Sequence, residues 1–218
     1  MRREATLIHG TASTASHTWE RNGWLELLED ADIAAALFPL PGHAGSPLPA
    51  AAPLASVVEA LLDNARDSTI LIGFSAGATL ALHAALAAEG RITTLVLLGL
   101  GDKFWSDGPA KPDTAERMRQ GAADSFTRLM TATATSAGNT LEDVATFIES
   151  AHSPPPLAGL GAISARTLII CGAADATGPV TRLASALPKA KVLSPAGLDH
   201  FRTASSREVM AAVLRFLR

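Results

Sequence analysis

The chain is organised around the stretch from Thr69 to Leu80, TILIGFSAGATL, which joins a short apolar run to an alanine-rich run. The branched side chains before Gly73 favour a buried β-strand, and the small side chains after Ser75 favour a helix. A turn this sharp leaves no room for a Cβ at Gly73 or Gly77, because the neighbouring strand and helix lie too close. The stretch therefore predicts a strand, a tight turn and a helix, with the Ser75 hydroxyl standing clear of the sheet.

The pattern G-x-S-x-G is weakly specific when it stands alone, and a structural serine at such a turn is the alternative interpretation. The helix that follows the motif makes a catalytic role for Ser75 more specific. A helix that begins at Ala76 points its free N–H groups and the positive end of its dipole toward the space above Ser75. This arrangement suits a developing oxyanion, so the serine is a candidate nucleophile whose partners must come from elsewhere in the chain.

The composition favours a globular protein of one domain. The chain has 218 residues, of which 48% are hydrophobic and 18% charged, enough for a sizeable core. A net charge of −3 and a pI near 6.1 give no basic footprint for nucleic acid or an anionic membrane. No apolar run approaches a membrane span, and the run at 6–8 is too short for a signal peptide. We therefore expect a cytoplasmic protein that acts on a small molecule; whether it forms a homodimer stays open.

Two residue types limit the chemistry. Cys171 is the only cysteine, so neither an internal disulfide nor a cysteine-based metal cluster can form. It lies in an apolar strand pattern, where a buried, inert thiol is expected. The chain contains no tyrosine, which excludes mechanisms that use a tyrosyl hydroxyl as the acid, including that of epoxide hydrolases.

Strand and helix patterns alternate along most of the chain, and this alternation predicts a doubly wound, mainly parallel α/β sheet. The continuous apolar character of the run at 92–100 indicates burial on both faces, as in a parallel sheet. Six strands are expected at 5–8, 33–40, 70–72, 92–100, 167–171 and 191–193, with helices at 24–28, 54–65, 76–89, from about 179, and at 205–217.

The alternation breaks down between the fourth and fifth strands. Turn residues at Gly108-Pro109 and a run of prolines at 154–156 bracket two helical patterns, 114–132 and 141–151, joined at 136–139. We interpret 102–160 as an insertion in a single domain spanning 1–218, placed as a lid over the serine. Six large apolar side chains of this segment either line an acyl pocket or pack the lid itself: Phe104, Trp105, Met118, Phe126, Met130 and Phe147.

Three groups with complementary chemistry follow strand ends in the order Ser75, Asp175, His200. The carboxyl ends of parallel strands lie at one edge of the sheet, so these residues are expected to converge. A serine hydroxyl needs a base, which His200 supplies, and Asp175 holds the imidazole tautomer. The backbone N–H groups of Thr11 and Ala76 are the candidate oxyanion donors.

Together these motifs resemble the α/β-hydrolase-fold superfamily, in its serine hydrolase form with a small cap. The matching residues are His9-Gly10 before the oxyanion loop, Pro41-Gly42-His43, the nucleophile elbow at 73–77, Asp175 and His200. The resemblance implies that 102–160 is the cap and that the sheet corresponds to family strands three to eight. We also expect His9 and Phe74 to contact substrate. His43 is expected to fix its turn through hydrogen bonds, with a role as base or ligand as the alternative.

Two further aspartates compete for the role of the acid. Asp102 follows the preceding strand, where some members of the fold place this residue, and Asp199 directly precedes the histidine. We favour Asp175, because Gly172-Ala173-Ala174-Asp175 follows a strong strand at the usual place.

The sequence thus predicts an acyl hydrolase that cleaves a carboxylic ester or thioester of a small, largely apolar substrate through an acyl-enzyme. It needs neither a metal nor an organic cofactor. A lyase that eliminates or breaks a carbon–carbon bond at the same site is the second hypothesis. A ligand-binding protein on a hydrolase scaffold is the third, because a fold and a motif do not by themselves prove turnover.

Overall fold

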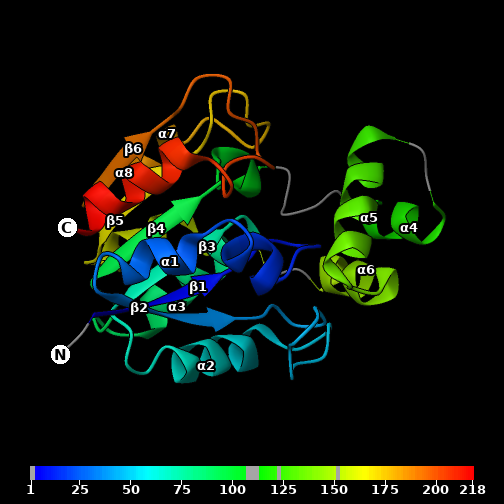
Figure 1. Ribbon diagram of the computed structural model, residues 1–218, viewed down its shortest axis with the longest axis horizontal. Coiled ribbons are helices and arrows are strands. Elements are labelled where there is room, and N and C mark those ends of the chain that lie inside the picture. Colours follow the sequence, from blue (N-terminus) through cyan, green and yellow to red (C-terminus); the bar gives the residue numbers. More distant parts are fainter. Residues whose placement is uncertain (1–2, 107–112, 122–123, 151–152) are drawn as a thin grey trace.

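The computed structural model describes residues 3–106, 113–121, 124–150 and 153–218, which form one sheet with helices on both faces (Figure 1). The sheet has six strands in the order β2-β1-β3-β4-β5-β6, and every neighbouring pair is parallel. The strands are β1 (Arg3–Ile8), β2 (Ile33–Phe38), β3 (Ile70–Phe74), β4 (Thr94–Leu98), β5 (Arg166–Ile170) and β6 (Ala190–Leu193). The predicted α/β sheet is confirmed.

Helices cover the two faces of the sheet and bury separate apolar clusters. One cluster joins the strands to α1 (Trp24–Glu29) and α8 (Arg207–Leu217). The other joins them to α2 (Leu54–Asn64), α3 (Ala76–Ala87) and α7 (Thr181–Ala186). Every residue of β3 and β4 is buried, as expected for strands covered on both sides. The packing of these strands therefore fixes the positions at which the following loops begin.

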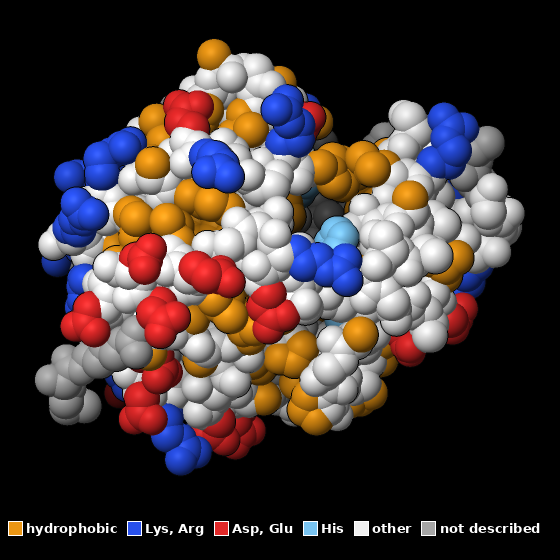
Figure 2. All heavy atoms as spheres, in the orientation of Figure 1, with side chains coloured by type: hydrophobic (Ala, Val, Ile, Leu, Met, Phe, Trp, Pro, Cys, Tyr) orange, Lys and Arg blue, Asp and Glu red, His pale blue; other side chains and the backbone are white. Residues whose placement is uncertain are grey.

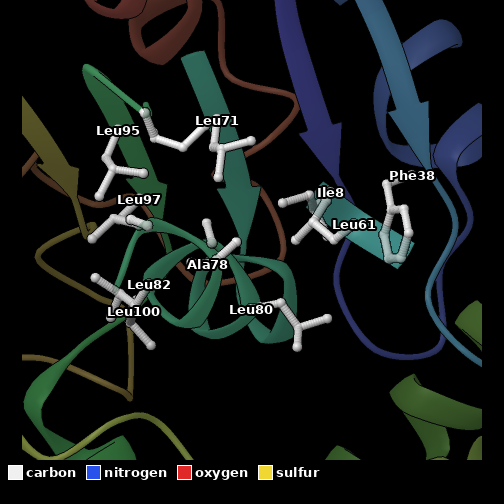
Figure 3. Close-up of a cluster of buried hydrophobic side chains, with 14 of the residues drawn as sticks. Ile8, Phe38, Leu61, Leu71, Ala78, Leu80, Leu82, Leu95, Leu97 and Leu100 are labelled. Atoms are coloured by element: carbon white, nitrogen blue, oxygen red, sulfur yellow. The ribbon is translucent and has the colours of Figure 1, made fainter. Parts of the chain in front are cut away.

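The central helix α3 packs directly on the strands. In Figure 3, Leu71 of β3 and Leu95 and Leu97 of β4 lie on the side of α3 that carries Ala78 and Leu82. The small residues of this helix permit a close approach to the sheet, since a Cβ on Gly77 would meet the carbonyl oxygens of Ile8 and His9. This contact fixes the start of α3 beside the end of β1.

Between β4 and β5 the described residues form three α-helices, drawn apart from the sheet in Figure 1, and the apolar cluster of these helices also includes Ala12 of the loop after β1. They are α4 (Thr114–Arg119), α5 (Ser125–Ala137) and α6 (Leu141–Glu149). The expected single helix at 114–132 is therefore wrong. The chain turns at Gly121, where φ is +64°, and the Asp124 side chain caps the N-terminus of α5.

Helix α5 also ends later than residue 132, where the sequence pattern placed the end of the helix. The helix continues through Ser136 and Ala137, and Gly138 terminates it with φ +80°. The expected turn at Gly108-Pro109 and the end of a helix at Ala151 lie outside the described residues.

Shorter helical turns complete the chain: η1 (Ser16–Glu20), η2 (Asp102–Trp105) and η3 (Leu157–Ala162). Within the described ranges, no helix has the length and apolar character needed to cross a membrane.

Candidate active site

Ser75 occupies the turn between β3 and α3 in a conformation that few residues adopt, with φ 54° and ψ −116°. Its N–H donates to the Leu98 carbonyl oxygen at 2.8 Å, which ties the turn to β4. A Cβ on Gly73 would collide with the backbone of Gly77 and Ala78. The predicted strand, tight turn and helix are present, and the packing explains why both glycines are required.

His200 and Asp175 lie beside this serine although 125 residues separate Ser75 from His200. The distance from Ser75 Oγ to His200 Nε2 is 3.1 Å, and that from His200 Nδ1 to Asp175 Oδ2 is 3.0 Å. Because the carboxylate only accepts, Nδ1 carries the ring hydrogen and Nε2 is left to accept the serine proton. The three groups therefore form a continuous chain of hydrogen bonds from hydroxyl to carboxylate.

The Asp175 carboxylate is held from both sides, and its side chain has no exposed surface. Thr177 donates to Oδ1 through its N–H and its hydroxyl, each at 2.8 Å. Burial alone would raise the pKa of Asp175, but the hydrogen bonds from His200 and Thr177 outweigh it and leave the pKa below its ordinary value. Thr177 was not anticipated, although an Asp-x-Thr sequence permits this local turn.

The two competing aspartates are engaged elsewhere. The Asp102 carboxylate accepts the N–H groups of Arg182 and Leu183 at 2.9 and 3.0 Å, at the start of α7. Asp199 accepts the N–H of Arg202 at 2.9 Å. Asp175 is thus the carboxylate that hydrogen-bonds to the His200 ring.

Thr11, in the loop after β1, and Ala76, the residue after Ser75, both line the same cavity. Ala76 is the first residue of α3, so its N–H has no acceptor within the helix. In the described part of the chain, neither the Thr11 N–H nor the Ala76 N–H donates to another backbone carbonyl. Both groups are therefore available to a bound oxygen atom.

His9 and His43 link the loops that follow β1 and β2. His9 Nε2 accepts the N–H of Leu40 at 3.0 Å, and His43 Nε2 accepts the N–H of Ala12 at 3.0 Å. Burial lowers the pKa of His9 to about 3 and that of His43 to about 4, so both rings are neutral. His43 fixes its turn as expected. His9 is fully buried and is not among the residues that line the cavity, so its expected contact with substrate stays a prediction.

Cys171 is buried at the end of β5, as expected. Burial, together with the nearby Asp175 charge, raises the pKa of its thiol to about 12, so the thiolate is not formed at neutral pH.

A cavity of about 590 Å³ opens above the serine. Figure 2 shows hydrophobic side chains beside a hollow between the sheet and the three-helix segment. Of the aromatic and methionine residues expected here, Phe74, Phe104, Phe126, Met130 and Phe147 line the cavity.

Two residues of that expected set lie elsewhere. Met118 is buried in the cluster of the three helices, and the Trp105 indole donates to the Pro155 carbonyl oxygen at 2.9 Å. Both positions were predicted from apolar character alone, which does not distinguish a pocket wall from the packing behind it. Thr79 was not anticipated: its buried hydroxyl lines the cavity and has no hydrogen-bond partner in the described structure.

The parallel sheet, the strained serine turn and the hydrogen-bonded Ser-His-Asp arrangement define the class of α/β hydrolases. A family model described as the alpha/beta hydrolase family matches residues 7–213, and the chain belongs to this family.

Individual relatives are more distant. The chain is 30% identical over 97 residues to the pimeloyl-[acyl-carrier protein] methyl ester esterase of Vibrio parahaemolyticus. This match covers 43% of the chain and 38% of the relative, so it spans well under half of that protein.

Two solved structures show the same fold over the full chain. MenH from Staphylococcus aureus has a TM-score of 0.78 at 18% identity, with 100% of this chain and 94% of MenH covered. A thermophilic esterase from Thermogutta terrifontis has a TM-score of 0.74 at 20% identity, with 99% and 89% covered.

Proposed function

We propose that this protein is a serine hydrolase that cleaves a carboxylic ester or thioester of a small, largely apolar substrate through an acyl-enzyme. The observation that carries the proposal is the hydrogen-bonded series from Ser75 through His200 to Asp175, at the floor of a cavity of about 590 Å³. The word esterase in the name of the Vibrio relative agrees with this reaction class.

The first half of the reaction forms the acyl-enzyme. Ser75 Oγ attacks the carbonyl carbon while His200 Nε2 removes the hydroxyl proton, for which the 3.1 Å contact is suited. The buried carboxylate of Asp175 stabilises the imidazolium that results. The imidazolium then returns its proton to the leaving alcohol or thiol as the bond from the carbonyl carbon to that group breaks.

The second half repeats the same proton movements with water. His200 removes a proton from a water molecule that attacks the acyl carbonyl, and it then protonates Ser75 Oγ as the acid is released. In both halves the carbonyl oxygen gains negative charge. The N–H groups of Thr11 and Ala76, which have no backbone acceptor among the described residues, are the proposed donors to that charge.

The cavity supports a substrate of limited size with an apolar acyl group. Phe104, Met130 and Phe147 form part of its wall, and a cavity of this volume is in the usual range for a small ligand. Because α5 and α6 contribute Met130 and Phe147 to the wall, we assign the segment 102–160 the role of a cap over the site.

The proposal is tested with p-nitrophenyl esters of increasing acyl length, using wild type, Ser75→Ala and the control Ser136→Ala. Ser136 is an exposed serine of α5, and its hydroxyl donates to a carbonyl within the same helix. We expect turnover by wild type and the control, and a loss of about 10⁴ to 10⁶ in rate for Ser75→Ala.

Mass spectrometry after treatment with an alkyl phosphonate provides the second measurement. An adduct on Ser75 together with an acyl burst supports the acyl-enzyme. Absence of ester turnover combined with an unlabelled Ser75 would refute the proposal and direct attention to elimination reactions or to ligand binding without turnover.

A further inference from the structure

The loop after β1 is held in place at Ala12, the residue that follows the proposed oxyanion donor Thr11. Ala12 has no exposed surface and adopts φ +67°, a left-handed conformation that costs a non-glycine residue about 1 kcal/mol. Its N–H donates to His43 Nε2 at 3.0 Å, and its carbonyl oxygen accepts from Asn139 Nδ2 at 2.9 Å. Side chains from two other segments thus hold both polar backbone atoms of this strained residue.

Asn139 makes two further hydrogen bonds. Nδ2 also donates to the Ser13 carbonyl oxygen at 3.0 Å, and Oδ1 accepts the N–H of Ala44 at 2.8 Å. These partners fix the orientation of the amide, because carbonyl oxygens only accept and a backbone N–H only donates. An aspartate would keep the contact with Ala44 but would place a carboxylate oxygen against two carbonyl oxygens.

Asn139 belongs to the three-helix segment, not to the sheet. It lies between α5 and α6, its side chain is buried with 9% of the residue exposed, and its own N–H donates to the Ala134 carbonyl oxygen at 2.9 Å. The same residue therefore caps α5 and grips the loop that carries Thr11. The contact with Ala12 joins residues 127 positions apart, and together with the bond to Ser13 it links the cap directly to this loop.

We infer that Asn139 is a positioning residue that aims the Thr11 N–H at the oxyanion through its hold on the Ala12 and Ser13 carbonyl groups. The inference rests on the proposed function, because it needs a carbonyl oxygen that becomes negative at this site. An oxyanion donor contributes only when its N–H lies close to hydrogen-bonding distance of the charged oxygen. If the Asn139 hydrogen bonds are lost, the strained backbone of Ala12 relaxes, and the N–H of the neighbouring Thr11 turns away from the oxyanion.

This role predicts a particular kinetic effect. The tetrahedral state depends on the donors far more than the bound ester does, so kcat falls while KM changes little. A residue that only stabilises the fold would instead lower the melting temperature without separating these two constants.

The test compares Asn139→Asp and Asn139→Ala with wild type and with Asn64→Asp. Asn64 is a matched control because its amide also donates to a backbone carbonyl, that of Leu37, but on the exposed side of α2. The measurements are kcat and KM for one p-nitrophenyl ester, inhibition by an alkyl boronic acid that forms a tetrahedral adduct on the serine, and inhibition by the neutral primary alcohol of the same chain length as the acyl group. Active-site titration with a phosphonate normalises each rate to folded, reactive enzyme.

We expect kcat to fall by about 10- to 100-fold for Asn139→Asp, with KM within about threefold of wild type. Boronic acid affinity should fall in parallel with kcat, whereas inhibition by the neutral alcohol and all constants of Asn64→Asp should not change. Asn139→Ala, which introduces no negative charge, should show the same pattern to a smaller degree.

Two results would overturn the inference while leaving the hydrolase assignment intact. One is an unchanged kcat in both Asn139 variants after normalisation. The other is an equal loss of boronic acid and alcohol affinity, which would indicate general damage to the site. If wild type itself fails to hydrolyse any ester, the proposed function fails first and the inference falls with it.

Discussion

His43 Nε2 accepts the backbone N–H of Ala12 at 3.0 Å, and this bond exists only while the imidazole is neutral. The other ring nitrogen donates to the Pro41 carbonyl oxygen at 2.9 Å, so both nitrogens are occupied in one defined tautomer. His9 forms a similar pair of contacts with Leu40 and Gly10 in the reverse direction between the same two loops. Two buried neutral histidines therefore hold the loops that follow β1 and β2 together.

Acid should destabilise the protein through these two rings. The pKa of His43 is lowered from 6.5 to about 4, and that of His9 to about 3, so in mild acid the unfolded chain binds more protons than the folded one. The free energy of unfolding is unaffected by them above pH 6.5 and falls as the pH drops below it, by up to about 1.4 kcal/mol per pH unit for each ring.

Urea unfolding between neutral pH and pH 4 measures this slope. His43→Gln keeps an acceptor for the Ala12 N–H but cannot take up the proton, so its unfolding free energy should depend less on pH than that of wild type. Equal slopes in the two proteins would show that His43 does not titrate in this way.

Replacement of Asp175 by asparagine should lower activity, whereas replacement of Asp102 by asparagine should lower thermal stability. Asp175→Asn should lower kcat by about 10⁴, because an amide favours the wrong imidazole tautomer, with little change in melting temperature. Asp102→Asn removes the charge that receives two N–H groups at the start of α7, so it should lower the melting temperature and retain most of the ester turnover. If Asp102→Asn lost kcat and Asp175→Asn lost only thermal stability, Asp102 would be the acid.

Substitution of the elbow glycines should be costly in a way that substitution of other glycines is not. A Cβ on Gly77 would contact the carbonyl oxygens of Ile8 and His9, whereas one on Gly161 would meet nothing within 4 Å. We expect Gly77→Ala to reduce the free energy of unfolding by about 1–3 kcal/mol or more, and Gly161→Ala to leave it nearly unchanged. Chemical denaturation of both variants decides the point; equal stabilities would contradict the packing argument.

Met130 and Met118 test which apolar residues face substrate. Met130 lines the cavity, and Met118 is 1% exposed within the cluster of the three helices. Met130→Ala enlarges the cavity and should shift the preference in kcat/KM toward longer acyl chains by about fourfold for each added methylene, since each one gains about 0.8 kcal/mol of burial. Met118→Ala should lower stability by about 2–5 kcal/mol without changing that preference. A preference that shifts with Met118 and not with Met130 would reverse the assignment.

The strand and helix pattern could be predicted because each element carries its own periodicity. The apolar run of β3, the glycines around Ser75 and the small residues of α3 act within a few positions of one another, so a short window contains the whole steric argument. The convergence of Ser75, Asp175 and His200 was predictable for a related reason. The geometry of a parallel sheet brings all strand ends to one edge, whatever the distance along the chain.

Predictions failed where a pattern suited two environments equally. The run at 114–132 has helical character throughout, but the chain turns at Gly121 and begins a new helix after Asp124. Likewise Met118 and Met130 are both apolar residues of the same segment, and only the packing of α4, α5 and α6 decides which one reaches the cavity.

The sequence by itself determined the sheet, the serine turn and the order of the three polar groups, because local sterics and strand geometry act independently of the rest of the fold. Only the tertiary structure decided that His9 and His43 bind each other's loops and that Asn139 grips Ala12 and Ala44. These contacts join backbone groups to side chains as many as 127 positions away. The periodicity of the sequence does not predict these hydrogen bonds, because each one depends on where the tertiary structure places both partners.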